Sequence, residues 1–475
     1  MARLSAFAGR PQALAMIAAV LGPTVCLAAA PTARLNIVLI VADDLGYGDL
    51  GCYGNAAAVT PNLDRLAEGG IRLTNFYAAQ ATCTSSRAAI LTGCYPNRIG
   101  VVGALNHTAT TGINPDETTL AEVLRARGYR TGIIGKWHLG HRPQFSPLRH
   151  GFEVFFGLPY SHDMWPSNRA APKNFFPDLP LMDGVAVVEK NPDPRRLTSR
   201  YTRRAVQFIT DHVAEPFFLY LAHNLPHVPL GSMRKRPAGR SLYQQVVTEI
   251  DESVGEVRSA LRRFGLEDQT LIVFTSDNGP WLLYGDHGGV TGGLREGKAT
   301  SFEGGVRVPC IVSWPGRIAP RRTSDEPAMN IDLLPTLAAI AGATPGPRGV
   351  DGIDLSNLLL ADKRPAPRPL YFYFLDRLHG VRFGRWKLEL PHTFPHVKTP
   401  GQRGSPGTYE TRRIELSLFD LERDPAQEKD VAQQHPDVVK QLTEMAEAAR
   451  ADLGDSLTAK RGTGIRPPDD VGNAK

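Results

Sequence analysis

Cysteine is scarce in this sequence of 475 residues. So few in a chain of this length exclude a fold built on disulfide bonds, although Cys52 and Cys94 are a conceivable pair; the five are Cys26, Cys52, Cys83, Cys94 and Cys310. No apolar run beyond the N-terminus is long enough to cross a bilayer, so stable membrane insertion is not expected. Dense lysine or arginine runs are also missing, and the net charge is only +6. A nucleic-acid-binding surface is therefore not expected either.

The first 30 residues have the three parts of a signal peptide. Arg3 and Arg10 supply a basic start, residues 13–27 an apolar stretch, and Ala28-Ala29-Ala30 the small residues of a cleavage site. An N-terminal membrane anchor is the alternative interpretation. We predict that residues 1–30 are removed and that the protein is exported, to the periplasm or out of the cell.

Apolar runs alternate with helix-like segments along most of the chain. Leu35 to Ala42 is a continuous run rich in β-branched residues, which is typical of a strand buried on both faces of a parallel sheet. Further strands are predicted at residues 129–135, 216–222, 271–276 and 307–314, and helices near 60–69, 119–127, 197–213, 241–264 and 331–341. This alternation predicts an α/β fold with a large, mostly parallel sheet flanked by helices on both faces.

The pattern changes near residue 365, where a Pro-rich segment indicates a linker. Short strand-like runs follow, and then a last helix at about 435–453. We predict a catalytic domain over residues 31–364, a smaller α+β domain over 365–457 with a short antiparallel sheet and a terminal helix, and a disordered tail over 458–475. Pocket-forming loops are expected at residues 166–194 and 392–412.

Two polar pairs directly follow apolar strands. Asp43-Asp44 ends the first strand, and Asp277-Asn278 ends a later one. Functional sites of parallel α/β sheets lie at the carboxyl ends of the strands, so we expect these side chains to converge. Three carboxylates and an amide form an oxygen ligand set suited to Ca²⁺ or Mg²⁺. Each pair taken alone would equally fit a helix cap or a turn.

The segment Cys83-Thr84-Ser85-Ser86-Arg87 is the second candidate site. We expect a short helix after Cys83, with Ser85 or Ser86 as its cap. Free N–H groups at a helix start attract anions, and Arg87 adds a planar cation suited to an oxyanion. A reactive group at position 83 would therefore face an anion site. From spacing alone, however, a buried structural cysteine is the favoured interpretation.

This segment resembles the signature of the sulfatase family, in which Cys is followed two positions later by Pro, four positions later by Arg, and then by Ala-Ala-Leu-Leu-Thr-Gly. Six further segments resemble family motifs in the same order: Asp43-Asp44-Leu45-Gly46-Tyr47-Gly48, Gly135-Lys136-Trp137-His138-Leu139-Gly140, Tyr160-Ser161-His162-Asp163, Pro226-His227-Val228-Pro229, Asp277-Asn278-Gly279-Pro280 and Lys298-Ala299-Thr300-Ser301-Phe302-Glu303-Gly304-Gly305. The resemblance extends from residue 35 to about residue 345. It is to the arylsulfatase A-like branch of formylglycine-dependent sulfatases, in the alkaline-phosphatase-like superfamily. Ser85 departs from it, because the family has Pro in this stretch, which the maturation enzyme reads.

The resemblance implies a reaction and a cofactor. Cys83 would be oxidised to formylglycine by a formylglycine-generating maturation enzyme, and its hydrate, a geminal diol, would attack the sulfur of a sulfate ester. The second hydroxyl would then expel sulfate, and Arg87 would steady the hydroxylated residue. One Ca²⁺ would polarise a sulfate oxygen. Its implied ligands are Asp43, Asp44, Cys83 in its oxidised form, Asp277 and Asn278.

The resemblance also implies roles for five other side chains. Lys136 and Lys298 would neutralise charge on the transferred sulfuryl group. His138 would hold a diol hydroxyl and assist the expulsion of sulfate. His227 would hydrogen-bond the leaving-group oxygen as a general acid. Ser161 would donate a hydrogen bond to the sulfate.

Two other functions stay open. A phosphodiester or phosphonate hydrolase of the same superfamily would share the fold, although several of these use two transition metals, His ligands and a Thr or Ser nucleophile. A non-catalytic anion- or glycan-binding relative would keep Cys83 unmodified, and Ser85 alone supports it. We predict a sulfuric ester hydrolase that acts on an aryl sulfate or a sulfated carbohydrate; a sulfolipid headgroup is also compatible.

Overall fold

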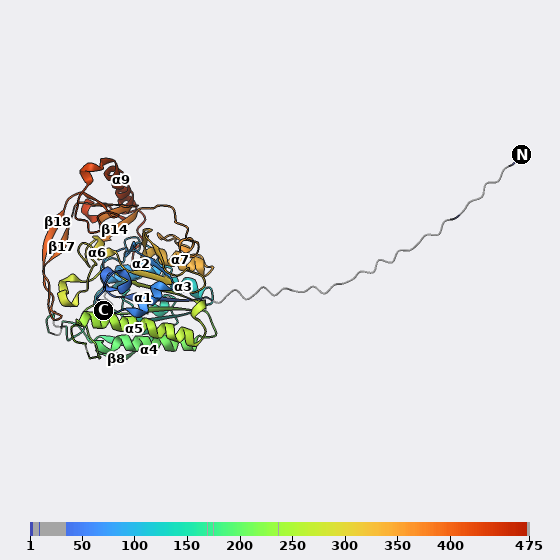
Figure 1. Ribbon diagram of the computed structural model, residues 1–475, viewed down its shortest axis with the longest axis horizontal. Coiled ribbons are helices and arrows are strands. Elements are labelled where there is room, and N and C mark those ends of the chain that lie inside the picture. The colour runs from blue at the N-terminus through green and yellow to red at the C-terminus, as the bar shows by residue number, and fades with distance from the viewer. Residues whose placement is uncertain (3–8, 10–34, 169, 174, 236, 473–475) are drawn as a thin grey trace. The chain divides into compact units, whose positions relative to one another are not determined.

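The computed structural model describes residues 1–2, 9, 35–168, 170–173, 175–235 and 237–472. The predicted signal peptide, residues 1–30, therefore lies almost entirely outside the described residues. Within them, no helix has the length and apolar character needed to cross a membrane. From Leu35 onward the chain forms one compact unit (Figure 1).

The centre of this unit is a sheet of ten strands in the order β12-β2-β11-β10-β1-β9-β5-β6-β7-β8. The five middle strands, from β10 to β6, are parallel, and antiparallel pairs occur toward both edges. This confirms the predicted large, mostly parallel sheet. The strands are β12 Arg322–Ser324, β2 Ile71–Leu73, β11 Cys310–Ser313, β10 Thr270–Ser276, β1 Asn36–Ala42, β9 Phe217–Ala222, β5 Arg130–Lys136, β6 Val154–Leu158, β7 Pro180–Asp183 and β8 Ala186–Lys190.

The middle strands end level with one another. Ala42 of β1 pairs with Ser276 of β10, and Gly135 of β5 pairs with Ala222 of β9. Val41 in turn pairs with Ala222, which joins the two halves of the sheet. The residues that follow these strands therefore meet at one edge, where parallel sheets place their functional groups.

Helices cover both faces of the sheet, as predicted. Side chains alternate along β1, so that Ile37 and Leu39 pack with α2, α3 and α7, whereas Val38 and Ile40 pack with α1, α4 and α5. Figure 1 shows α4 and α5 running side by side. The helices are α1 Pro61–Glu68, α2 Cys83–Thr92, α3 Leu120–Arg125, α4 Leu197–Asp211, α5 Leu242–Arg263, α6 Glu303–Val306, α7 Leu333–Ile340 and α8 Ser356–Ala361.

A smaller antiparallel sheet follows in the C-terminal part, in the order β14-β15-β16-β19, and α9 packs against it (Figure 1). This confirms the predicted short sheet and terminal helix. Its core includes Tyr77 and Ala89 from the first part of the chain, and the boundary at residue 364 stays a prediction. The elements are β14 Leu370–Phe374, β15 Arg377–Phe383, β16 Trp386–Glu389, β19 Ser417–Asp420 and α9 Pro436–Leu453.

Three local expectations were wrong. Residues 392–412 were expected to be a pocket-forming loop, and they form most of a hairpin, β17 (His392–Thr399) with β18 (Thr408–Ile414). Residues 166–194 likewise contain the hairpin β7–β8. Helix α2 begins at Cys83 and not after it, because the Ser86 N–H already donates to the Thr82 carbonyl at 3.0 Å. Cys83 therefore lies within the first helical turn.

Residues 458–463 bond to α9 and the turn after it, and residues 464–471 bond to the first part of the chain, so these residues do not form the expected disordered tail. Within them, β20 (Asp469–Asp470) pairs with β4 (Thr111–Gly112). Arg466 donates two hydrogen bonds, each 2.7 Å long, to the carboxylate of Glu117, whose side chain is only 3% exposed. A polar composition predicts disorder, but this bidentate pair anchors the segment.

The four cysteines in the described part of the chain are all free thiols. The conceivable disulfide between Cys52 and Cys94 is therefore not formed. Cys83, Cys94 and Cys310 are buried, and Cys52 is half-buried.

Replacing Arg466 with Ala should lower the free energy of unfolding by about 1–3 kcal/mol, because buried Glu117 would lose both 2.7 Å hydrogen bonds and keep only the 3.5 Å contact with Arg348. Urea unfolding followed by tryptophan fluorescence measures this change. Arg461→Ala is the matched control, since Arg461 is exposed in the same segment and should matter by less than about 0.5 kcal/mol. Equal stability of the two variants would contradict an anchoring role for Arg466.

Candidate active site

The carboxyl ends of five parallel strands, one helix start and one loop supply the candidate site. All of its members are buried except Lys298, which is half-buried with a side chain 10% exposed. They are Asp43 and Asp44 after β1, Asp277 and Asn278 after β10, Lys136 and His138 at the end of β5, His227 after β9, Ser161 after β6, Cys83 and Arg87 on α2, and Lys298 before α6. The structure thus brings the sequence-predicted residues to one edge of the sheet.

Asp44 and His138 have left-handed backbone conformations, with φ values of 64° and 62°. Successive side chains of a strand normally point to opposite faces. The left-handed turn after β1 instead lets neighbouring carboxylates approach the same atom, the Sγ of Cys83, which is 3.2 Å from Asp43 Oδ1 and 3.9 Å from Asp44 Oδ1. Asp and His tolerate this conformation better than β-branched residues do.

Asp43 is the centre of the charge arrangement. Its Oδ2 lies 2.5 Å from Lys136 Nζ and 3.7 Å from Arg87 Nη2, and all three side chains are fully buried. Burial alone would raise the pKa of Asp43, but the charges of Lys136, His227 and Arg87 outweigh it and hold the pKa well below its ordinary value. Asp43 is therefore a firmly ionised carboxylate.

Arg87 ties two strand ends together. Its Nε donates to Asp277 Oδ2 at 3.0 Å, and its Nη1 donates to the backbone carbonyl of Lys136 at 3.0 Å. Burial and the nearby charge of Asp43 raise the pKa of Asp277 to about 7, although Arg87 opposes them. The planar guanidinium serves both strands at once, which a lysine could not do.

Lys298 places a second ammonium group beside Cys83. Its Nζ donates to Asp44 Oδ2 at 2.8 Å and lies 3.4 Å from the Sγ of Cys83. Burial would lower the pKa of Lys298, but the Asp44 carboxylate prevails and holds it well above its ordinary value. Burial and Asp43 likewise raise the pKa of the Cys83 thiol, which Lys136 and Lys298 only partly oppose. The unmodified thiol is thus neutral and a weak nucleophile.

The two histidines are each held through one ring nitrogen. His138 Nε2 lies 2.8 Å from the carbonyl of Leu105, and His227 Nδ1 lies 2.6 Å from the carbonyl of Val228. A carbonyl can only accept, so both contacted nitrogens carry hydrogen. Burial, helped by the charge of Lys136, keeps the pKa of His138 well below its ordinary value, so this ring is neutral.

Four potential metal ligands lie close together: one atom from each of Asp43, Asp44, Cys83 and His227, all within 4.8 Å of one another. The predicted ligands Asp277 and Asn278 adjoin this group, because Asp277 Oδ1 accepts from the Asp44 N–H and Asn278 Nδ2 donates to Asp44 Oδ1 at 2.6 Å. Asn278 Oδ1 is buried and has no hydrogen-bond partner among the described residues. Such an acceptor suits a cation.

Two aromatic rings lie beside His227: that of His162, which belongs to a family-like segment but had no predicted role, and that of Trp281, which was not predicted. His162 and Trp281 pack against its imidazole, with ring centres 5.7 Å and 5.3 Å away. Trp281 also lies under Lys298 Nζ, 4.4 Å from the ring centre, and its Nε1 donates to the hydroxyl of Tyr409 on β18 at 3.0 Å. The position of Trp281 three residues after Asn278 was the available signal. Tyr409 lies on a hairpin far away in the sequence, and no sequence pattern linked it to the site.

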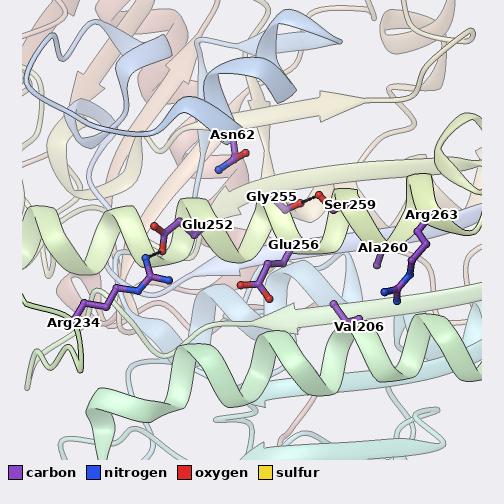
Figure 2. Close-up of a pocket in the computed structure, with 9 residues that line it drawn as sticks. All are labelled: Asn62, Val206, Arg234, Glu252, Gly255, Glu256, Ser259, Ala260 and Arg263. Atoms are coloured by element: carbon purple, nitrogen blue, oxygen red, sulfur yellow. Dashed lines mark hydrogen bonds and ion pairs between the residues drawn. The ribbon is translucent and has the colours of Figure 1, made fainter.

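A separate cavity of about 560 Å³ lies beside α5, where Arg234 pairs with Glu252 (Figure 2). None of its lining residues belongs to the candidate site. Three cations around a nucleophile position, at the carboxyl edge of the sheet, instead suit the candidate site to the transfer of an anionic group.

Known proteins identify the class. The family model described as Sulfatase matches residues 35–343. Arylsulfatase A of Bos taurus is 43% identical over 424 residues, which cover 82% of each chain, and N-acetylgalactosamine-6-sulfatase of Mus musculus is 37% identical over 452 residues, which cover 88% of this chain and 85% of the relative. The solved structure of Ps i-CgsB in complex with k-i-k-neocarrahexaose has a TM-score of 0.73 at 30% identity and covers 87% of this chain and 92% of that one.

The chain therefore belongs to the sulfatase family and resembles its arylsulfatase A-like members. It is a sulfuric ester hydrolase with the alkaline-phosphatase-like fold.

Replacing Arg87 with Met, an uncharged side chain of similar length, should lower the free energy of unfolding by about 3–5 kcal/mol. Asp277 and Asp43 would then stay buried without the cation that pairs with them. Chemical unfolding measures the loss. Arg203→Met on the exposed side of α4 controls for the change of residue type and should be close to the unsubstituted protein. A loss no larger than that of the control would contradict the bridging role of Arg87.

Proposed function

We propose that this protein hydrolyses the sulfate ester of an aryl or carbohydrate alcohol, with a nucleophile derived from Cys83 by oxidation to formylglycine. The observation that carries the proposal is the placement of Cys83 Sγ between the Asp43 carboxylate and the Lys298 ammonium group, at 3.2 Å and 3.4 Å. A hydroxyl at this position would donate to Asp43 and stay close to a cation. In its hydrated form the residue supplies the attacking hydroxyl.

The cations and one histidine then act on the substrate. Lys298 Nζ lies 3.4 Å from Cys83 Sγ, and Lys136 Nζ pairs with Asp43, the carboxylate that Cys83 also contacts. Both ammonium groups would stabilise negative charge on the sulfuryl oxygens. His227 directs Nε2 to within 3.6 Å of Asp44 Oδ2, while Val228 holds its other nitrogen. With both ring nitrogens protonated, Nε2 would carry the hydrogen that His227 gives to the leaving-group oxygen. Ser161, buried after β6, would donate to a sulfate oxygen.

The residues present fit one hard cation. With an oxygen in place of the Cys83 sulfur, every nearby donor except His227 is an oxygen, and Asn278 offers an acceptor without a partner among the described residues. Asp43, Asp44, residue 83, Asp277 and Asn278 would hold Ca²⁺. When bound, the ion polarises a sulfate oxygen.

Adding Ca²⁺ to chelator-treated protein should raise the free energy of unfolding by about 2.7 kcal/mol when its concentration is a hundredfold above Kd. Thermal unfolding over a Ca²⁺ titration measures the effect. Asp44→Asn should greatly reduce it. Asp49→Asn should not, since Asp49 is a buried carboxyl that binds Tyr243 and backbone N–H groups instead. No stabilisation by Ca²⁺ would contradict the calcium assignment.

The aromatic side chains near His227 favour a substrate whose leaving group contains a ring. Trp281 packs against both His227 and Lys298, and its partner Tyr409 is 40% exposed. Aromatic faces bind aryl groups and the apolar faces of sugars. The relative Ps i-CgsB was solved with a carbohydrate, k-i-k-neocarrahexaose. Both findings support an aryl sulfate or a sulfated glycan as substrate.

Two cellular steps complete the proposal. The protein is exported through its N-terminal segment to the periplasm or the medium. A formylglycine-generating enzyme acts on the unfolded segment around Cys83, because the folded protein buries this residue to 2% exposure.

The matured protein should hydrolyse 4-nitrophenyl sulfate with a higher kcat/KM than bis(4-nitrophenyl) phosphate or 4-nitrophenyl phenylphosphonate, since the described residues of the site offer one hard-cation position and no cluster of histidine ligands. Cys83→Ala should lower kcat for the sulfate by more than about 10³-fold, because the nucleophile is lost. Release of 4-nitrophenol measures both. Cys310→Ala, which removes another buried free thiol outside the site, is the matched control.

A preference for the phosphodiester or the phosphonate would favour the corresponding hydrolase of the same superfamily. Full sulfate turnover by Cys83→Ala would contradict the assigned nucleophile.

A further inference from the structure

Ser85 makes contacts that a proline could not make. It is fully buried in the first turn of α2. Its hydroxyl donates to the carbonyl of Gly103 at 2.9 Å, and its backbone N–H donates to the same oxygen at 3.2 Å. The hydroxyl of Thr82 in turn donates to Ser85 Oγ at 3.1 Å. The residue that departs from the family signature is thus bonded to a second segment of the chain.

The neighbouring Thr84 holds the same segment two residues further on. Its Oγ1 accepts a hydrogen bond from the Leu105 N–H at 3.1 Å. Gly103 itself has a φ of +78°, and a Cβ there would approach the Leu375 side chain to 2.9 Å. The backbone of residues 103–105 is therefore fixed between α2 and the C-terminal part, with little room to shift.

Residues 103–105 also contact a candidate catalytic residue, His138, through a backbone hydrogen bond. The carbonyl of Leu105 accepts the hydrogen bond of His138 Nε2 at 2.8 Å. His138 Nδ1 is buried and has no hydrogen-bond partner within the described ranges. The Leu105 carbonyl thus selects the tautomer with hydrogen on Nε2, which leaves the Nδ1 lone pair to accept from a hydroxyl.

We propose that Ser85 is a positioning residue for His138, acting through the backbone of residues 103–105. The proposal rests on the proposed function, in which His138 holds a hydroxyl of the oxidised residue 83. On this proposal Ser85, which stands where the family signature has Pro, has a function in the folded site. The rival interpretation is that Ser85 is only a weakened maturation signal.

Ser85→Pro separates the two interpretations. Proline fits the first turn of a helix, where its missing N–H is not needed by the helix, so the variant should fold. It removes both hydrogen bonds to Gly103. The weakened-signal interpretation expects more aldehyde at residue 83 and no loss of turnover per aldehyde. The positioning role expects lower turnover per aldehyde, however much aldehyde forms.

The experiment measures three quantities for Ser85→Pro, Ser85→Ala and Ser85→Thr: the aldehyde fraction at residue 83 by peptide mass spectrometry, kcat per aldehyde, and KM, with 4-nitrophenyl sulfate. We expect kcat per aldehyde to fall about tenfold in Ser85→Pro and less in Ser85→Ala, with KM within about twofold. Ser85→Thr keeps both donors and should retain most of kcat. An unchanged or higher kcat per aldehyde in Ser85→Pro would overturn the proposal.

A second readout does not depend on turnover. In ¹⁵N-histidine-labelled protein carrying Cys83→Ala, the His138 resonances, assigned with His138→Asn, report which nitrogen bears hydrogen. We expect the Nε2-protonated tautomer with Ser85 and a mixture with Ser85→Pro. Ser86→Ala is the matched control, because the Ser86 hydroxyl binds Asn330 instead. An unchanged His138 tautomer in Ser85→Pro would overturn the positioning role. If the tautomers are as expected but the protein does not hydrolyse the sulfate ester, only the proposed function is contradicted.

Discussion

The buried carboxylate of Asp43 is the interaction on which the site depends. A carboxylate taken out of water at the end of the central strand is stable only if cations meet it. Lys136 and Arg87 do so at 2.5 Å and 3.7 Å, and both come from other elements. The same carboxylate accepts the contact from Cys83. One desolvated charge thus fixes the relative positions of β1, β5 and α2.

The topology of the sheet makes this arrangement possible. Parallel strands deliver their following residues to one edge, and the left-handed conformation at Asp44 turns two successive carboxylates toward one atom. Arg87 then locks β10 to β5. The cationic side chains of the site balance its carboxylates before any substrate binds. A bound metal ion would therefore make the net charge of the site positive, which attracts an anionic ester.

The sequence predicted most of this, because the polar residues directly follow apolar strands that a parallel sheet must place side by side. It missed contacts made by residues far apart in the chain. Tyr409 reaches Trp281 only because residues 392–412 form most of a hairpin. Arg466 orders the C-terminal segment through Glu117. Neither partner carries a local pattern, so only the folded chain brings them together. The geometry also adds His227 to the potential metal ligands.

The most direct test of the account is the mass of the tryptic peptide Leu73–Arg87, taken from protein purified from its own host. This peptide contains Cys83 as its only cysteine. We predict an aldehyde at residue 83 in most molecules, which reacts with a hydrazide probe and lowers the mass of the peptide relative to the thiol form. A peptide that carries only the unmodified thiol would contradict the central claim that the charges around Asp43 surround an oxidised Cys83.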